Sequence, residues 1–463
     1  MKIFLYLLFA ITGFFLSIYY SYSTQETALL CVTFVTSAFV LIRMKTMRDN
    51  VFILLILLYI FFSVQIVALF QLSSYGFYIN IISDKEYERL ALWGNHLFFV
   101  VFSVLAFFSI FQHKKKSNIA TIETAKSKDF APLLKFCSIL VVFLQIVSLI
   151  FGLAGNQEDA RMVLPFHLNG IIDEYRATIY PFIFVVYLYD RLSGGGKIER
   201  KWVIVYIIYA LLEVFVRNSK GSLLISFAPV LLICFYMGQI NKRFAARYIV
   251  PLFMAVVMLY PVVENARSYG QISFETLFSS ANNLKNVDET EKSSPYIRTF
   301  LTGCYYMKCD SYVSKNEFEF DFHNVPMLLA LRGGAAYMTR IIDGVPDTVH
   351  HSSGVTGLCD ALLWGGYPMC YFITIILTIL AVWADKSILF NKNILYKIIF
   401  FGWFYQRLMS TTISFFIDNL FLPSVVSLVL EIFIANYYTK NYCKKRHYGD
   451  NSENLHISYA NNK

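Results

Sequence analysis

The side chains best suited to proton transfer are two adjacent histidines, His350 and His351, which precede the small residues Ser352, Ser353 and Gly354. Histidine titrates near neutral pH and can accept the proton of an attacking hydroxyl group. We predict that His351 is the general base, because the small residues beside it let a substrate approach the backbone. His350 is the second candidate. Contact with a phosphate group is the alternative role for this pair.

Two cations at a helix junction form a second candidate site. Arg217 and Lys220 lie between two apolar segments that are joined by a very short connection. Together with Ser222 and the free backbone N–H groups at the start of the next helix, these cations would face a bound anion. The alternative is that both side chains only extend to the membrane interface.

Two further stretches gather polar residues between apolar ones. The larger is an insert of about a hundred residues, 264–360, whose arginines Arg267, Arg298 and Arg340 we expect near the anion site. The smaller is the connection from Gly155 to about Tyr175. Its charged residues and histidine, with the arginine that follows, are Asp159, Arg161, His167, Asp173, Glu174 and Arg176. A solvated loop with local ion pairs is the alternative for this connection. No HExxH motif and no carboxylate-rich cation motif accompanies these residues, so we expect no metal site and no cofactor.

The segments that must position these residues are strongly apolar. The 463 residues are 57% hydrophobic and 15% charged, with a mean hydropathy of +0.53. Soluble domains have about 45 to 50% apolar and about 25% charged residues. Several runs reach the roughly 20 apolar residues that cross a bilayer as a helix, and the alternation typical of a membrane β-barrel is absent. We therefore predict an all-α, polytopic integral membrane protein.

About twelve apolar runs are candidate membrane spans. They fall near residues 3–20, 28–42, 51–72, 91–111, 134–154, 176–190, 202–216, 222–238, 247–263, 361–383, 395–416 and 419–438. They divide the chain into transmembrane helices 1 to 9 (1–263), a large external loop (264–360), transmembrane helices 10 to 12 (361–440) and a tail (441–463). We expect the first run to be an uncleaved span, because no small-residue cleavage pattern follows it.

Lysine and arginine are concentrated in alternate connections. These basic segments are residues 43–48, 114–128, 191–201, 242–247, 386–392 and 444–446. Cytoplasmic loops of membrane proteins carry such an excess. We therefore predict that both termini are cytoplasmic. Residues 264–360 and the connections near 84–89, 155–175, 217–221 and 418–419 should lie on the other face.

The net charge of +9 follows mainly from these basic connections, so no nucleic-acid partner is expected. Membrane lipids are expected partners, and the basic segments are compatible with anionic head groups. The two halves of the chain show no internal repeat, which counts against transporters that are built from repeats.

In its architecture and in two short stretches, the chain resembles the O-antigen polymerase and O-antigen ligase group of bacterial membrane glycosyltransferases. The architecture is about twelve spans with one large external loop in the last third. The stretches are Ser-Lys-Gly-Ser-Leu-Leu from Ser219, after a short external turn, and His-Ser-Ser-Gly from His351, before a helix with Gly-Gly. Lys220 stands where the family pattern has arginine, and His351 matches the family's external histidine.

One pattern of the family is missing. Some polymerases have an arginine followed ten residues later by a glycine, and neither external loop has that spacing. No role therefore passes to Arg161 or Arg332.

The resemblance implies a reaction and a place for it. The substrates would be oligosaccharide repeat units linked to undecaprenyl pyrophosphate, so that the lipid carrier is part of a substrate and not a cofactor. His351 would accept the proton of the attacking sugar hydroxyl. The cations that would bind the pyrophosphate are Arg217, Lys220, Arg267, Arg298 and Arg340. The resemblance also implies that the protein lies in the bacterial inner membrane with its large loop in the periplasm. It further implies a chain-length regulator and a flippase as partners.

Two other functions stay open at this point. An O-antigen ligase, which transfers a finished glycan to lipid A-core, would share this site. A lipid-linked oligosaccharide flippase or other transporter belongs to another class. It would require repeat symmetry and charged residues in the middle of spans.

Overall fold

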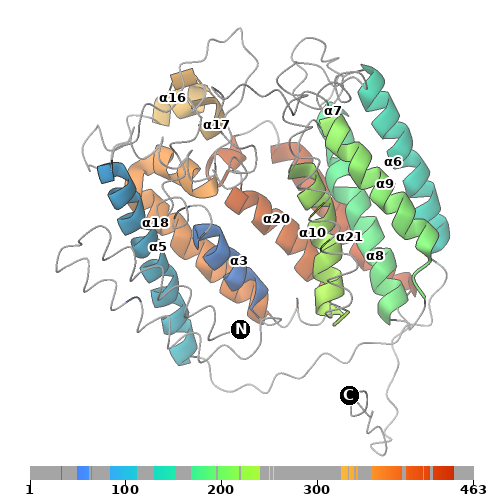
Figure 1. Ribbon diagram of the computed structural model, residues 1–463, viewed down its shortest axis with the longest axis horizontal. Coiled ribbons are helices and arrows are strands. Elements are labelled where there is room, and N and C mark those ends of the chain that lie inside the picture. Colours follow the sequence, from blue (N-terminus) through green and yellow to red (C-terminus); the bar gives the residue numbers. More distant parts are fainter. Residues whose placement is uncertain are drawn as a thin grey trace, which may run out of the picture.

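The computed structural model describes part of the chain. The described residues are 33, 50–61, 64, 84–111, 130–151, 168–193, 197–217, 221–239, 250, 254, 325–331, 333–337, 340–341, 356–387, 390, 393–409, 411–417 and 421–442. Every element within these ranges is a helix, so the all-α prediction is confirmed for them. Figure 1 shows the helices gathered into a bundle.

Three helices build one half of this bundle, which we call the α18 half. They are α3 (Val51–Ile60), α5 (Asp84–Phe111) and α18 (Gly357–Lys386), and their buried side chains form one hydrophobic core. Asp385, near the end of α18, accepts the backbone N–H groups of Phe52 at 3.2 Å and Ile53 at 3.1 Å. These bonds cap α3, whose own N-cap residue makes no capping bond.

The other half, which we call the α9 half, holds the second hydrophobic core. Its elements are α6 (Ala131–Phe151), α7 (Leu168–Glu174), the π-helix η4 (Tyr175–Ile179), α8 (Tyr180–Ser193), α9 (Arg200–Arg217), α10 (Gly221–Tyr236) and α21 (Phe421–Tyr442). Helices α7, η4 and α8 follow one another without a break. Helix α20 (Ile394–Met409) lies between the halves in Figure 1 and contributes side chains to both cores.

Within the described residues, four helices are long and apolar enough to cross a membrane. They are Leu90–Phe108 in α5, Ala131–Phe151, Gly357–Lys386 and Phe421–Lys440. Four such helices in one chain indicate a multi-pass membrane protein. The larger number, about twelve spans, stays a prediction.

Two of these helices turn apolar side chains outward and polar ones inward. In α6, Gln145 is fully buried whereas Phe136 is 64% exposed. In α21, Glu431 is buried whereas Phe433 is 63% exposed. A helix at the surface of a water-soluble protein has the opposite arrangement. Contact with lipid explains the apolar outer faces.

Helix α18 is interrupted after its second turn. Gly366 has φ 65° and ψ −159°, and Gly365 also leaves the helical region. A positive φ favours glycine because a Cβ atom would clash with the backbone. The Gly-Gly pair therefore breaks α18 into a short first part, which begins at Gly357, and a long second part.

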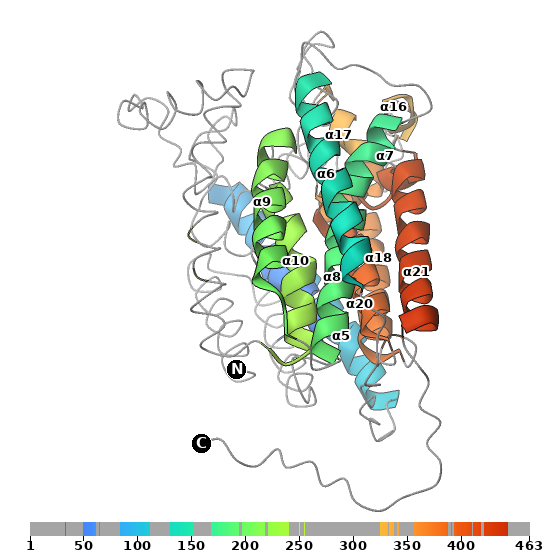
Figure 2. The same cartoon turned by 90° about the vertical axis from the view of Figure 1, so that its right-hand side faces the viewer.

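Several connections that the sequence predicts on one face meet at one end of the bundle. Both views place α7, α16 (Val325–Ala330) and α17 (Gly334–Tyr337) at this end, which we call the α7 end (Figures 1 and 2). The last residue of α9, Arg217, contacts Asp173 of α7 and so lies there too. The described parts of the connections at 155–175, 217–221 and 264–360 thus share one end.

Two predicted boundaries are wrong. Residues 168–175, predicted as part of a connection, are helical, because their charged side chains find partners on α9. The run 395–416 is not one helix. Helix α20 ends at Met409, and Ser414–Phe416 form the short 3-10 helix η8, since backbone N–H groups of this segment bind a side chain of α18.

The insert also differs from its prediction in the residues that the structure describes. It contains the short helices α16 and α17, and its last residues, from Gly357, already belong to α18. The hydroxyl of Thr356 accepts the N–H of Cys359 and caps this helix. The candidate spans near 3–20, 28–42 and 247–263 lie, apart from single positions, outside the described residues.

Candidate functional site

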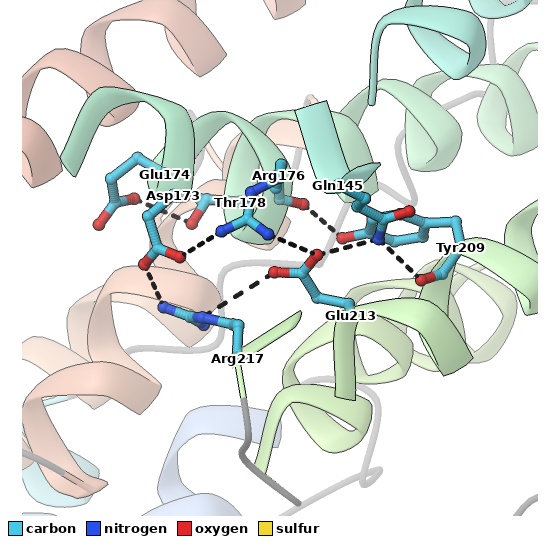
Figure 3. Close-up of polar contacts among 8 residues, drawn as sticks. All are labelled: Gln145, Asp173, Glu174, Arg176, Thr178, Tyr209, Glu213 and Arg217. Carbon is cyan, nitrogen blue, oxygen red and sulfur yellow. Dashed lines mark hydrogen bonds and ion pairs between the residues drawn. The ribbon is translucent and has the colours of Figure 1, made fainter. Parts of the chain in front are cut away.

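Five polar side chains meet at the α7 end of the α9 half. This charged cluster, drawn in Figure 3, consists of Gln145 from α6, Asp173 from α7, Arg176 from η4, and Glu213 and Arg217 from α9. It contains two arginines and two carboxylates. The connection 155–175 and the helix junction at Arg217, which are about forty residues apart in the chain, therefore form one site.

Arg176 is the buried centre of the charged cluster. Its side chain is 0% exposed, and it donates from Nη2 to Asp173 Oδ1 at 2.9 Å and from Nη1 to Glu213 Oε2 at 3.4 Å. Glu213 is 1% exposed. A buried ion pair is costly to break, because the remaining charge has lost its solvation and has no counter-charge. Arg176 and Glu213 therefore fix each other in place.

Arg217 is the accessible cation of the charged cluster. It donates from Nη2 to Asp173 Oδ2 at 2.6 Å, and its Nε lies 3.9 Å from Glu213 Oε1. The side chains of Arg217 and Asp173 are each 26% exposed. The Asp173 carboxylate thus bridges two arginines, one buried and one open to the α7 end.

The local backbone explains why Arg176 can sit here. It lies in η4, a single π-helical turn within a continuous helix, and such turns often occur at functional sites. The hydroxyl of Tyr209 on α9 donates to the backbone carbonyl of Arg176. Gln145 donates from Nε2 to Glu213 Oε2 at 2.9 Å and to the Tyr209 carbonyl at 3.0 Å. Helices α6, η4 and α9 are therefore joined by polar bonds at the charged cluster.

A further carboxyl group lies beside the charged cluster. Glu174 accepts hydrogen bonds from Thr178 at 3.0 Å and from Ser424 of α21 at 3.4 Å. Burial raises the pKa of Glu174 above its usual range, and the charge of Asp173 acts in the same direction. The hydrogen bond from Thr178 partly offsets these effects.

The start of α10 adds a second feature next to Arg217. Helix α10 begins at Gly221, and Ser222 in its first turn is 2% exposed. Its hydroxyl makes no hydrogen bond within the described residues. A helix start offers unpaired N–H groups and a positive dipole end, and arginine binds oxyanions through a planar pair of donors. These groups together suit an anion such as a phosphate or diphosphate.

Only some of the predicted site residues are among those that the structure describes. Arg217 belongs to the charged cluster. Arg340 lies shortly after α17, and its role in binding the pyrophosphate stays a prediction. The remaining predicted residues, Lys220, Arg267, Arg298, His350 and His351, lie outside the described residues, so their roles stay predictions.

Two members of the charged cluster were not proposed from the sequence. Glu213 lies four residues before Arg217 in an apolar helix, and that spacing places both side chains on one face. Gln145 and Ser148 stand three residues apart within the apolar run of α6. A polar residue at helical spacing inside a span is the signal that could have identified both, because such residues face protein and not lipid.

A second polar centre lies in the α18 half. The buried carboxylate of Asp360, in the first turn of α18, accepts the backbone N–H groups of Thr412, Ile413 and Ser414 at 2.9, 2.8 and 2.9 Å. The Ser414 hydroxyl donates to the same carboxylate. It also accepts the N–H of Gly334 and the ring N–H of Trp364, each at 2.8 Å. We call this group the Asp360 centre.

The Asp360 centre holds backbone segments together and leaves no room for a ligand. A Cβ atom at Gly334 would lie 2.5 Å from Asp360 Oδ1. Asp360 is 0% exposed. Within the described part of the chain, no three His, Cys, Asp or Glu side chains are placed to hold a metal ion.

Comparison with known proteins adds no relative. No family model, no curated protein and no solved structure matches this chain.

Proposed function

We propose that this protein is a bacterial inner-membrane polymerase that joins undecaprenyl-pyrophosphate-linked oligosaccharide repeat units into a surface polysaccharide. The observation that carries the proposal is the accessible Arg217, which the buried Arg176–Glu213 pair and Asp173 hold at the end of a helical membrane bundle. A cation fixed at a membrane surface suits a lipid-linked diphosphate. The resemblance to O-antigen polymerases supplies the reaction.

The chemistry requires cations and one base. The acceptor hydroxyl oxygen forms a bond to the anomeric carbon of the donor, and the bond from that carbon to the pyrophosphate oxygen breaks. Undecaprenyl pyrophosphate leaves with the electron pair. Arg217 and Lys220 bind its phosphates, aided by Arg267, Arg298 and Arg340, and this binding lowers the barrier electrostatically. His351 takes the hydroxyl proton, with His350 beside it.

The proposal includes an orientation. The α7 end faces the periplasm together with residues 264–360, and both termini lie in the cytoplasm. The excess of lysine and arginine in the opposite connections supports this orientation. Single cysteines introduced at Asn282 and Lys315, in a variant whose native cysteines are replaced by serine, should react with a membrane-impermeant thiol reagent in spheroplasts. Protection of both positions would reverse the orientation.

The genetic test separates a polymerase from the ligase alternative. A deletion strain should carry single repeat units on the lipid A-core if the protein is the polymerase. It should carry no glycan on the core if the protein is a ligase. A glycan of normal length would contradict both functions. The polymerase would act beside a flippase and a chain-length regulator.

One observation favours a transporter as the second candidate. Glu431 lies near the middle of α21 and is buried, and charged residues in mid-span are typical of transport pathways. Proteoliposomes with a lipid-linked oligosaccharide distinguish the two candidates. A polymerase lengthens the glycan, whereas a flippase moves it across the bilayer at constant length.

A further inference from the structure

The buried face of α21 carries three polar side chains, Ser427, Glu431 and Tyr438. The buried positions are Pro423, Ser427, Glu431, Ala435 and Tyr438, which recur every three or four residues. This spacing places them on one face of the helix. That face packs against α7, η4, α8 and α20, and Figure 2 shows α21 beside α7 and α8.

Glu431 lies near the midpoint of the span. Helix α21 has 22 residues, and Glu431 is about 15 Å along it from Phe421 at 1.5 Å per residue. Its side chain is 7% exposed. Among the described residues, its carboxyl makes no hydrogen bond and no ion pair.

The charge that acts on Glu431 within the described residues is another carboxylate. It belongs to Glu174, which receives the hydroxyl of Ser424 at 3.4 Å. Ser424 lies seven residues from Glu431, or about 10 Å nearer the α7 end. A negative neighbour makes the ionised form of Glu431 less favourable and cannot replace a cation.

The described charged groups on the elements packed against α21 have other partners. Arg176 of η4 binds Asp173 and Glu213, and Asp190 of α8 accepts the Tyr438 hydroxyl at 2.9 Å. Arg191 of α8 pairs with Glu199, whereas Lys397 and Arg407 of α20 lie over the rings of Tyr236 and Phe415. None of these groups neutralises Glu431.

Ser427 is a second, independent observation at this position. It is 2% exposed, and its hydroxyl has no hydrogen-bond partner within the described residues. Helical side chains tilt toward the N-terminus, so the Glu431 carboxyl leans toward Ser427, one turn away. A hydroxyl can pair with a protonated carboxyl, but it cannot balance a full negative charge in an apolar region.

We propose that Glu431 is a proton-binding site in the middle of the membrane, with Ser427 as its hydrogen-bond partner and Glu174 as the carboxyl that links it to the α7 end. An ionised carboxyl without a cation is strongly unfavourable in a membrane interior, whereas the neutral acid needs only one hydrogen-bond partner. The site does not depend on the glycosyltransferase proposal, because it uses none of the predicted substrate-binding residues.

Infrared spectroscopy of the full chain in lipid nanodiscs tests the site. At neutral pH the wild-type protein should show the carbonyl-stretch absorption of protonated carboxylic acid, and the wild-type minus Glu431→Gln difference spectrum should contain the band of one such group. Glu199→Gln is the matched control, because Glu199 is 38% exposed at the opposite end, and it should keep the band. Glu174→Gln should keep the band at neutral pH. When the pH is raised, the band of this variant should disappear at a lower pH than in the wild type, because the repelling charge of Glu174 is gone.

Two results would overturn the proposal. One is a wild-type spectrum without acid absorption, and the other is a Glu431→Gln spectrum whose acid absorption equals that of the wild type. If Glu431→Gln does not fold, Glu431→Asp in protein with 13C-labelled glutamate should move the band to its unlabelled position. Stabilisation by sodium chloride but not potassium chloride, lost in Glu431→Gln and without an acid band, would identify a sodium site instead.

Discussion

The buried carboxylates in the two halves of the bundle have different kinds of partners. In the α18 half, Asp360 receives three backbone N–H groups and the Ser414 hydroxyl, and no charged side chain among the described residues contacts it. In the α9 half, Asp173 and Glu213 are shared between Arg176 and Arg217. The side chains of Arg217 and Asp173 are each 26% exposed. The carboxylate of Asp360 is therefore fully buried, whereas the charged cluster reaches the surface at Arg217 and Asp173.

The difference separates a structural role from a binding role. Backbone N–H groups cannot leave Asp360 without unfolding the segment at 411–417, so the Asp360 centre fixes the chain. The Arg217–Asp173 pair is formed by partly exposed side chains at the edge of the charged cluster. An incoming oxyanion can therefore replace Asp173 on Arg217, while the buried Arg176–Glu213 pair keeps the site in place.

The largest effect on stability is expected at the Asp360 centre. Asp360→Ala leaves three buried N–H groups without an acceptor, and each such group costs about 1 to 3 kcal/mol. The free energy of unfolding should therefore fall by more than about 3 kcal/mol. Reversible unfolding in mixed micelles measures it, with Asp360→Asn as the milder variant that keeps one acceptor. A loss below about 1 kcal/mol would show that the carboxylate does not hold this segment.

The next largest effect is expected at the buried pair. Arg176→Met should destabilise the protein by about 3 to 5 kcal/mol, because it leaves the buried Glu213 with only the partly exposed Arg217, 3.9 Å away, as a counter-charge. The double variant Arg176→Met/Glu213→Gln should recover most of this loss. A double-mutant cycle measures the coupling. Additive effects of the two substitutions would mean that the two side chains do not stabilise each other.

A smaller effect on stability is expected at the accessible arginine. Arg217→Ala removes a partly exposed ion pair and should cost about 1 kcal/mol or less. The melting temperature of the variant in detergent should stay close to that of the wild type. A loss as large as that of Arg176→Met would remove the distinction between the buried and the accessible cation.

The smallest effect concerns the pH dependence of stability. Because burial raises the pKa of Glu174, the folded protein holds this proton at pH values where the unfolded chain has released it. The contribution of this group to stability is therefore present below the ordinary Glu value of about 4.3 and is lost as the pH rises above it. Melting curves of Glu174→Gln should decline less with rising pH than those of the wild type. Parallel curves would contradict the assignment.

Hydropathy and charge were sufficient for the class of fold and for several helix positions. The run near 134–154 corresponds to α6, and the run near 419–438 corresponds to α21. Hydropathy failed where polar residues are helical. Residues 168–175 looked like a loop because nothing in the local sequence reveals that Asp173 will pair with Arg217, forty-four residues later.

The composition of the site was only partly predictable for the same reason. Arg217 could be found, since a cation between two apolar runs is conspicuous. Glu213 and Gln145 could be recognised as side chains that face protein, but they could not be placed in this cluster, because that depends on how α6, η4 and α9 pack together. The segment after Met409 was wrongly predicted to continue the helix, because its apolar residues suit a helix. The helix ends there because backbone N–H groups of this segment bind Asp360, about fifty residues earlier.

The most direct test of the account is an in vitro assay with purified protein and an undecaprenyl-pyrophosphate-linked repeat unit. Arg217→Ala should lower the rate of glycan elongation by about 10²-fold or more, as expected for loss of a group that stabilises the leaving anion. The matched control is Arg191→Ala, since Arg191 is a partly exposed arginine paired with Glu199 at the opposite end of the bundle, and it should retain the wild-type rate. A wild-type rate in Arg217→Ala, or an equal loss in Arg191→Ala, would contradict the assignment of the charged cluster as the pyrophosphate site.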